Sequence, residues 1–277
     1  MFEGMTEKTA SWLKADGNDS AIVVSSRVRL ARNIQNMMYP ARSSPEESAN
    51  VREFVRTALE KASILNVGEF YKSEEISSLD RKFLIERHLI SPEFFTDRLS
   101  RALYITDSED TSVMVNEEDH LRIQALASGM DIQKAMSIAE SIDHRLGDTL
   151  AYDYDSDYGF LTSCPTNCGT GMRASILIHL PGLVLTREID KVIEQITKLG
   201  LAVRGFYGEG TEVLGNLFQI SNQTTLGRTE NDILESIQQI TRQMIEHEEN
   251  ARKVLVRDAP DEIKDKIWRA YGILKHA

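Results

Sequence analysis

Five arginines lie on or beside segments with the alternating pattern of β-strands: Arg27, Arg29, Arg122, Arg173 and Arg204. Arg27 and Arg29 are two residues apart, so an extended backbone points both side chains to one face. Guanidinium groups are permanently cationic and form paired hydrogen bonds with phosphate oxygens. Several arginines from separate strands of one sheet would therefore clamp a polyphosphate. The alternative is that each is a surface residue paired with one of the many acidic residues.

Two acidic loops offer the complementary chemistry. One contains Glu117, Glu118 and Asp119, and the other contains Glu209 and Glu212. Paired carboxylates can hold a guanidinium or an amine in a fork and can accept a proton from it. A solvated acidic turn is the alternative interpretation of the first loop.

The two cysteines, Cys164 and Cys168, lie in the loop CPTNCGTG. They are too few for a zinc site, because there is no second cysteine pair and the nearest histidine, His179, lies on the following predicted strand. A reactive thiolate is possible for Cys164, since nearby positive charge lowers the pKa of a thiol. A buried structural cysteine is the alternative, and Cys168 is given no role.

The elements that must position these side chains are short strands, concentrated between about residues 100 and 222. Their order with two interleaved helices predicts an α+β domain with a largely antiparallel sheet flanked by helices. Strands are expected at 21–24 and onward through the segment SSRVRLARN, and at 103–106, 112–116, 120–127, 158–164, 173–179, 201–206 and 216–221. Helices are expected at 45–62, 76–91, 131–146, 187–199, 230–256 and 261–275.

Composition excludes several classes of function. The net charge of −11, from 32 Lys and Arg against 43 Asp and Glu, disfavours a protein whose main activity is binding duplex nucleic acid. No segment has the pattern of a signal peptide or the length of a membrane span, so we expect no membrane association. Two cysteines suit a reducing compartment, which predicts a cytoplasmic protein. The usual glycine-rich phosphate loops are absent from the sequence.

Four ordered segments, SSRVRLARN, NEEDHLRI, CPTN-x-GT-x-x-RAS and RG-x-x-GE-x-x-E, resemble the catalytic domain of the guanidino (phosphagen) kinases. Within that family the similarity is greatest to the McsB type, the protein-arginine kinases, and it covers about residues 20–255. The resemblance implies a lead-in at 1–20, a catalytic domain at 21–255 and, at 256–277, the start of a C-terminal helical region that is apparently truncated.

The resemblance also implies site residues and partners. Glu118 and Glu212 would hold the acceptor guanidinium, with Cys164 beside it. ATP and Mg²⁺ would be the cofactors, with the metal held mainly through ATP and water rather than by the protein. Residues matched to the nucleotide site are Ser25, Ser26, Arg27, Val28, Arg29, His88, Arg122, Arg173, Ala174, Ser175, Ile176, Leu177, Arg204, Gly205, Phe206, Tyr207, Gly208 and Glu209.

The implied activity is ATP-dependent phosphorylation of arginine side chains in proteins, which would mark them for a Clp-type protease. An McsA-type activator and a heat-shock repressor would be partners, and a homo-oligomer is possible. Small-molecule relatives carry a helical domain before the SSRVR-like strand, whereas only 24 residues precede Ser25 here, which favours an open acceptor site. The alternatives are a kinase of a free guanidino compound and a catalytically weak nucleotide-binding adaptor. Ile237, Ile240, Met244 and Ile245 share one helix face, which is either core or a dimer contact.

Overall fold

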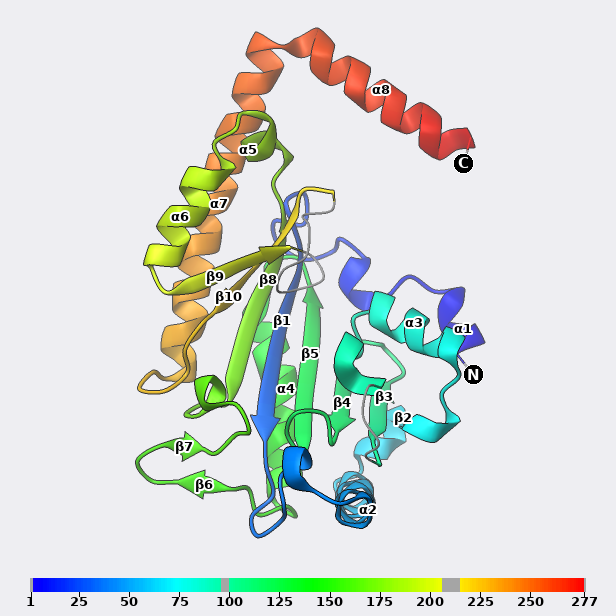
Figure 1. Cartoon of the computed structure of the whole chain (residues 1–277). Helices are drawn as coiled ribbons and strands as arrows, with labels where there is room; N and C mark the ends of the chain where they lie inside the picture. The colour runs from blue at the N-terminus through cyan, green and yellow to red at the C-terminus, as the bar shows by residue number, and fades with distance from the viewer. Residues whose placement is uncertain (1, 96–99, 206–214, 277) are drawn as a thin grey trace.

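The computed structural model describes residues 2–95, 100–205 and 215–276. Its centre is an eight-stranded sheet in the order β2-β3-β4-β5-β1-β8-β10-β9, and all neighbouring strands are antiparallel (Figure 1). Its strands are β1 Val23–Arg32, β2 Gly68–Lys72, β3 Ala102–Thr106, β4 Thr111–Val115, β5 Leu121–Ser128, β8 Met172–His179, β9 Leu201–Gly205 and β10 Leu217–Asn222. The predicted α+β class, with an antiparallel sheet flanked by helices, is confirmed.

The helices begin where the sequence supplies capping side chains. Ser44 and Glu47 form a reciprocal capping box at the start of α2, with Pro45 at its first position, and Thr229 and Asp232 do the same for α7. The helices are α1 Glu3–Thr6, α2 Pro45–Lys61, α3 Ser78–Glu86, α4 Ile132–Gly147, α5 Pro181–Leu185, α6 Ile189–Lys198, α7 Glu230–Asp258 and α8 Pro260–His276.

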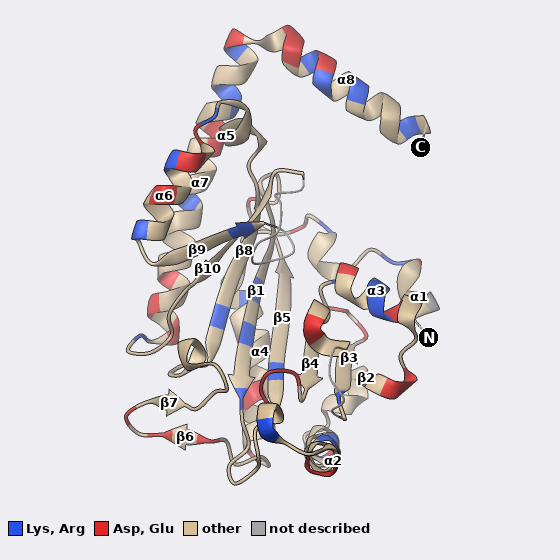
Figure 2. Ribbon diagram, viewed as in Figure 1, with Lys and Arg blue, Asp and Glu red and all other residues tan. Residues whose placement is uncertain are grey.

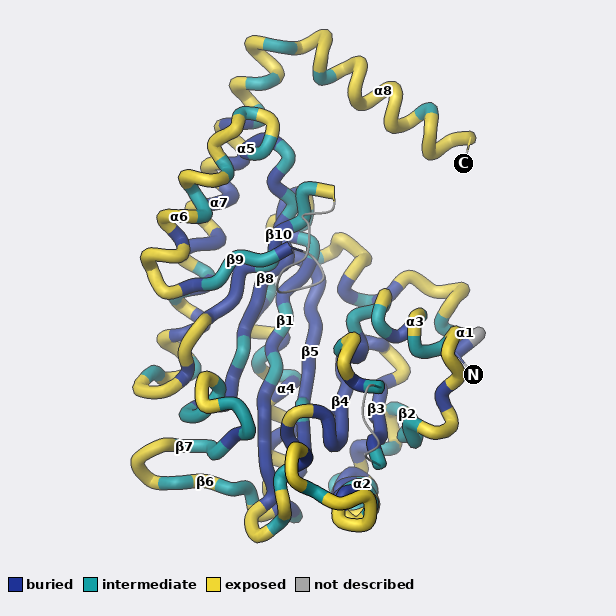
Figure 3. The backbone as a smooth tube through the Cα atoms, in the orientation of Figure 1, coloured by how far each residue is buried: buried dark blue, intermediate teal, exposed yellow. Residues whose placement is uncertain are grey.

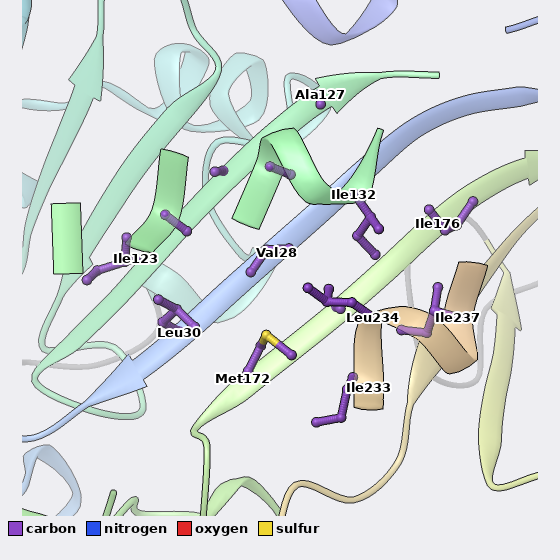
Figure 4. Close-up of a cluster of buried hydrophobic side chains, with 14 of the residues drawn as sticks. Val28, Leu30, Ile123, Ala127, Ile132, Met172, Ile176, Ile233, Leu234 and Ile237 are labelled. Atoms are coloured by element: carbon purple, nitrogen blue, oxygen red, sulfur yellow. The ribbon is translucent and has the colours of Figure 1, made fainter. Parts of the chain in front are cut away.

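One face of the sheet forms the main hydrophobic core with α2, α4 and α7. Along β1, Val28 and Leu30 point to this face, and both are buried. Figure 4 shows them beside Ile123 of β5 and beneath α4 and α7. The core-facing side chains at the base of α7, namely Ile237, Ile240, Met244 and Ile245, are buried. In the described part of the chain these four residues therefore belong to the core.

The described residues cover the other face only in part. Leu103 and Ile105 of β3 and Met114 of β4 pack with residues of α3 and with Phe2 in a second cluster. This cluster covers the β3–β4 half of the sheet, as the position of α1 and α3 in Figure 1 shows. On the same face, β5, β1, β8 and β9 carry the arginines, and Trp12 packs with Leu126 of β5 and Leu177 of β8 in a third, smaller cluster.

Three expectations about elements need correction. The strand expected at 158–164 is limited to β7, Gly159–Phe160, which pairs with β6, Tyr154–Asp155. Beyond it, the backbone N–H of Ser163 donates to the carboxylate of Asp119 rather than to a strand. The helix expected at 76–91 ends at Glu86, because His88 adopts a left-handed conformation with φ of 56°. The edge strand β2 was missed because GEFYK shows no alternation and its residues are mostly half-buried.

Helix α8 extends away from the sheet (Figure 1) and most of its residues are exposed (Figure 3). Its Trp268 is 68% exposed. No helix among the described residues is long and apolar enough to cross a membrane.

Candidate active site

Strand register brings the arginines together on the partly open face of the sheet. Arg29 of β1 lies opposite Arg173 of β8, and on its other side it lies opposite Gln124 of β5, two residues from Arg122. Across the next pair of strands, Arg204 of β9 lies opposite Gln219 of β10. Figure 2 shows the basic positions on β1, β5, β8 and β9 in neighbouring parts of the sheet.

The five arginines line one cleft with a volume of about 350 Å³. His88 and Gln219 also line it, and both contribute to a smaller adjoining cavity of about 20 Å³. Members of the predicted nucleotide site that line one or both spaces are Ser25, Arg27, Arg29, His88, Arg122, Arg173, Ser175, Leu177 and Arg204. A cleft of this size with five cationic groups is suited to a polyanion.

Burial and mutual repulsion disfavour the charged arginines of the cleft when no anion is bound. Burial, with the charges of Arg173 and Arg122, lowers the pKa of Arg27 to about 10. Burial and then Arg27 hold the pKa of Arg29 well below its ordinary value. Arg27 donates to Gln219 Oε1 at 2.9 Å, while Arg29 Nε is buried with no hydrogen-bond partner among the described residues. A bound polyanion would relieve this repulsion, which is an independent sign that phosphate fits here.

The acidic loop after β4 borders the arginine cleft. Arg122 lies 2.8 Å from Glu117 Oε2 and donates to Glu118 Oε2 at 3.0 Å. Burial, together with the charges of Asp119 and Glu117, raises the pKa of Glu118 although Arg122 opposes the shift. A carboxylate with a raised pKa is a stronger base than an ordinary one.

Hydrogen bonds hold this loop in place. The Asp119 carboxylate accepts from Asn33 Nδ2 and from the Ser163 N–H, both at 2.7 Å. Ser163 Oγ donates to the carbonyl oxygen of Glu118 at 2.7 Å. The residue after Ser163 is Cys164, whose Sγ lies 3.1 Å from Thr166 Oγ1. The structure therefore joins the Glu118 and Cys164 loops, which are far apart in the sequence, while Cys168 lies beside Thr162.

Four residues matched to the nucleotide site belong to the opposite face of the sheet. Val28, Ala174 and Ile176 are in the main hydrophobic core. Ser26 Oγ donates to the carbonyl oxygen of Gly129 and accepts from the N–H of Asp131, which precedes α4. Their side chains point away from the cleft. Gly205 ends β9, and the predicted residues Phe206, Tyr207, Gly208, Glu209 and Glu212 lie outside the described residues.

Sequence reasoning missed several residues of the site. Gln219 binds Arg27, Gln124 donates to the His88 carbonyl oxygen at 2.6 Å, and Ser91 Oγ donates to Glu117 at 2.7 Å. Trp12 lines the small cavity, with its ring centroid 5.3 Å from that of His88. The two glutamines could have been found from strand alternation, since each lies two residues from other cleft-facing positions.

The environment of His88 makes a prediction about pH. Burial and the neighbouring Arg27 lower the pKa of His88 to about 4, against an ordinary value of 6.5. Between these values the unfolded chain takes up a proton that the folded chain does not, so stability falls as the pH drops from about 6.5 to about 4. In thermal melts, the melting temperature of His88→Gln should therefore fall less over this pH range than that of the unmodified protein. His144→Gln, at a histidine exposed on α4, is the control. Parallel pH profiles for the unmodified protein and His88→Gln would contradict the assignment.

Comparison with known proteins agrees with this geometry. Residues 50–251 match the family described as ATP:guanido phosphotransferase, C-terminal catalytic domain. The protein-arginine kinases of Bacillus mycoides (strain KBAB4) and Bacillus cereus (strain G9842) are each 45% identical over 275 residues, which is 99% of this chain and 77% of theirs.

Solved structures give the same fold. The duplicated taurocyamine kinase from Schistosoma mansoni, with bound transition-state analogue components, has a TM-score of 0.75 and 27% identity, over 83% of this chain and 33% of that one. A lombricine kinase, at 23% identity, has a TM-score of 0.76 over 88% of this chain and 71% of its own, which shows the shared fold alone.

The family match includes Arg122, Arg173 and Arg204, and the longer matches extend over β1 with Arg27 and Arg29. The arginine-lined face of the sheet therefore lies within the shared region. The match covers most of the chain, and its sheet is the one found in the solved relatives. The chain belongs to the ATP:guanido phosphotransferase family.

Proposed function

We propose that the chain transfers the γ-phosphoryl group of ATP to the guanidinium group of arginine side chains in proteins. The observation that carries the proposal is the convergence of five arginines on one cleft beside the fixed Glu118 loop. Nearly full-length similarity to enzymes named protein-arginine kinase supports the choice of acceptor.

In this proposal the arginine cluster binds and neutralises the polyphosphate. Arg27, Arg29, Arg122 and Arg173 contact phosphate oxygens, and Arg204 closes the β9 side of the cleft. Ser25, Ser175 and Leu177 lie toward the base, with His88 against it. Ser26, Val28, Ala174 and Ile176 support the strands from the core side. Gly205, Phe206, Tyr207, Gly208 and Glu209 are assigned to the nucleotide site on the resemblance alone.

The acceptor needs a base, because a guanidinium with a pKa above about 12 has no free lone pair on nitrogen. We assign this role to Glu118, with Glu212 completing the fork that aligns the planar group. As the N–P bond forms, the bond from γ-phosphorus to the bridging oxygen breaks, and the guanidinium proton passes to a carboxylate. Glu118 accepts a hydrogen bond from the guanidinium of Arg122, which supports this assignment. Cys164 would tune the charge beside the acceptor without forming a covalent bond.

Mg²⁺ is assigned to ATP and water rather than to a protein site. Within residues 2–95, 100–205 and 215–276, no group of three or more His, Cys, Asp or Glu side chains could hold a metal ion. The arginines of the cleft are placed to hold the polyphosphate, so we assign the metal to the nucleotide. When bound, the ion helps to neutralise the charge of the transferring group.

The cellular setting is proposed from the resemblance. Arginine-containing proteins are the substrates, and phosphorylation marks them for a Clp-type protease. An McsA-type activator and a heat-shock repressor are partners, and the chain can form a homo-oligomer. Its two cysteines are both free, which suits work in the cytoplasm. The net charge of −11 argues against direct nucleic-acid binding.

Phosphorus NMR tests the proposed acceptor. The chain is incubated with Mg-ATP and either a loosely folded arginine-rich protein or free arginine, with Glu212→Ala as the control. We expect an acid-labile N–P signal on the protein with the unmodified chain and none with the variant. A signal on free arginine alone would make the chain a kinase of a small guanidino compound. No signal on either acceptor, with ATP still bound, would favour a nucleotide-binding adaptor.

A further inference from the structure

The cleft changes from charged to apolar along the strands. Arg29 and Arg173 lie opposite each other near one end of β1. Toward the other end of that strand, the same sheet face presents Leu126 of β5, which lies opposite Arg27, and Leu177 of β8, which lies opposite Ser25. A phosphate chain fits the first end, whereas the second end is apolar.

Trp12 covers the apolar end. It lies in the 3₁₀ helix η1, Ser11–Leu13, is only 3% exposed, and packs with Leu126 and Leu177 in a separate small cluster. Its ring meets the His88 ring edge-on, with centroids 5.3 Å apart. The cavity of about 20 Å³ lies among these residues, which is room for one water-sized group.

The indole nitrogen of Trp12 lacks an acceptor among the described residues. Trp12 Nε1 is buried and has no hydrogen-bond partner in the described parts of the chain. A buried donor without an acceptor is unfavourable, and native proteins rarely leave one so. Because Trp12 lines the adjoining cavity, a group that enters there can supply the missing acceptor.

The N-terminal segment is firmly attached at this point. Arg87 donates to the carbonyl oxygens of Met5 and Lys8, both at 2.7 Å, and lies 3.2 Å from a Glu109 carboxylate oxygen. The next residue is His88, whose own carbonyl oxygen is bound by Gln124. The turn that carries His88 therefore also holds the segment that carries Trp12.

We propose that Trp12 is a base-recognition residue, and that the N-terminal segment completes the nucleotide site. The purine base lies in the cleft beside His88, next to the small cavity, and its edge accepts from the indole N–H of Trp12 through one water in that cavity. This inference rests on the proposed function in one respect, namely that the ligand of the cleft is a purine nucleotide.

The test uses the two tryptophans of the chain, Trp12 and Trp268. In Trp268→Phe, Trp12 is the only tryptophan, and Trp268 lies exposed on α8. We expect Mg-ADP to change the Trp12 emission of this variant, and inorganic tripolyphosphate, which has no base, to leave it unchanged. Equal changes with both ligands would overturn the base contact. The fluorescence experiment keeps Trp12 itself, so it does not depend on a substitution in the packed cluster.

A second variant measures the contribution of the indole. Trp12→Phe keeps an aromatic ring but removes the N–H, and it should bind ADP about three- to tenfold more weakly, with tripolyphosphate affinity unchanged. Calorimetry on the unmodified chain separates the two proposals. If ADP binds but neither Trp12 emission nor Trp12→Phe affinity changes, the role of Trp12 is wrong and the proposed function stands. If ADP does not bind at all, both the proposed function and the role of Trp12 are wrong.

Discussion

Replacing Glu118 with glutamine should lower kcat for arginine phosphorylation by roughly 10²- to 10⁴-fold, the usual contribution of a general base. The amide is nearly the same size as the carboxylate, but it cannot accept the guanidinium proton. Glu118 is bonded to Arg122, and burial raises its pKa, so it is suited to take up a proton during the reaction. Steady-state rates with a protein acceptor measure the effect. The KM for ATP should change only a few-fold, since the phosphate-binding arginines remain.

A matched substitution on the opposite side of the sheet controls for a general loss of charge. Glu140 is exposed on α4, near His144 and away from the cleft. Glu140→Gln should retain the activity of the unmodified chain. If Glu118→Gln were as active as Glu140→Gln, Glu118 would not be the base.

Replacing Arg29 with methionine should stabilise the free protein and weaken nucleotide binding at the same time. Burial, with the charges of Arg27, Arg122 and Arg173, holds the pKa of Arg29 well below its ordinary value. Methionine keeps the apolar stem and removes the repulsion, and each kcal/mol gained raises the melting temperature by about 2–4 °C. Loss of one charge-assisted contact to phosphate should weaken ADP binding by roughly 10- to 100-fold. Thermal melts with and without Mg-ADP measure both effects.

The control for this substitution is Arg56→Met on α2. Arg56 forms exposed pairs with Glu53 and Glu60, and such pairs contribute little to stability. Arg56→Met should leave the rise in melting temperature caused by Mg-ADP unchanged. A lower melting temperature for free Arg29→Met would mean that Arg29 stabilises the unliganded cleft, contrary to our account of the repulsion.

Local pattern was enough for the strands of the main sheet other than β2, and for part of the arginine cluster. The spacing of Arg27 and Arg29 fixes them to one face of any extended segment, and β1 places them there. That Arg29 lies opposite Arg173 was not accessible, because the pairing of β1 with β8 depends on packing between residues far apart in the chain. The same limit applies to the contact of Ser163 with Glu118.

Motif similarity alone does not separate residues that touch a ligand from those that support them. Ser25 and Ser26 are neighbours in one motif, yet only Ser25 lines the cavity, while Ser26 binds the start of α4. Alternation would have distinguished them once the core face of the strand was known. Trp12 was missed because a single aromatic residue in a polar lead-in carries no periodic signal.

The alternation of β1 also bears on how faithfully the chain folds. Val28 and Leu30 enter the core while Arg27 and Arg29 face the cleft, and β5 and β8 fix this register from both sides. A slip of one residue would drive two guanidinium groups into the apolar layer beneath α4, at a cost of several kcal/mol for each uncompensated charge. Arg27 and Arg29 thus also disfavour the misaligned register during folding. A chain that lacked both arginines would more readily form the wrong register, and it would also lose its ligand.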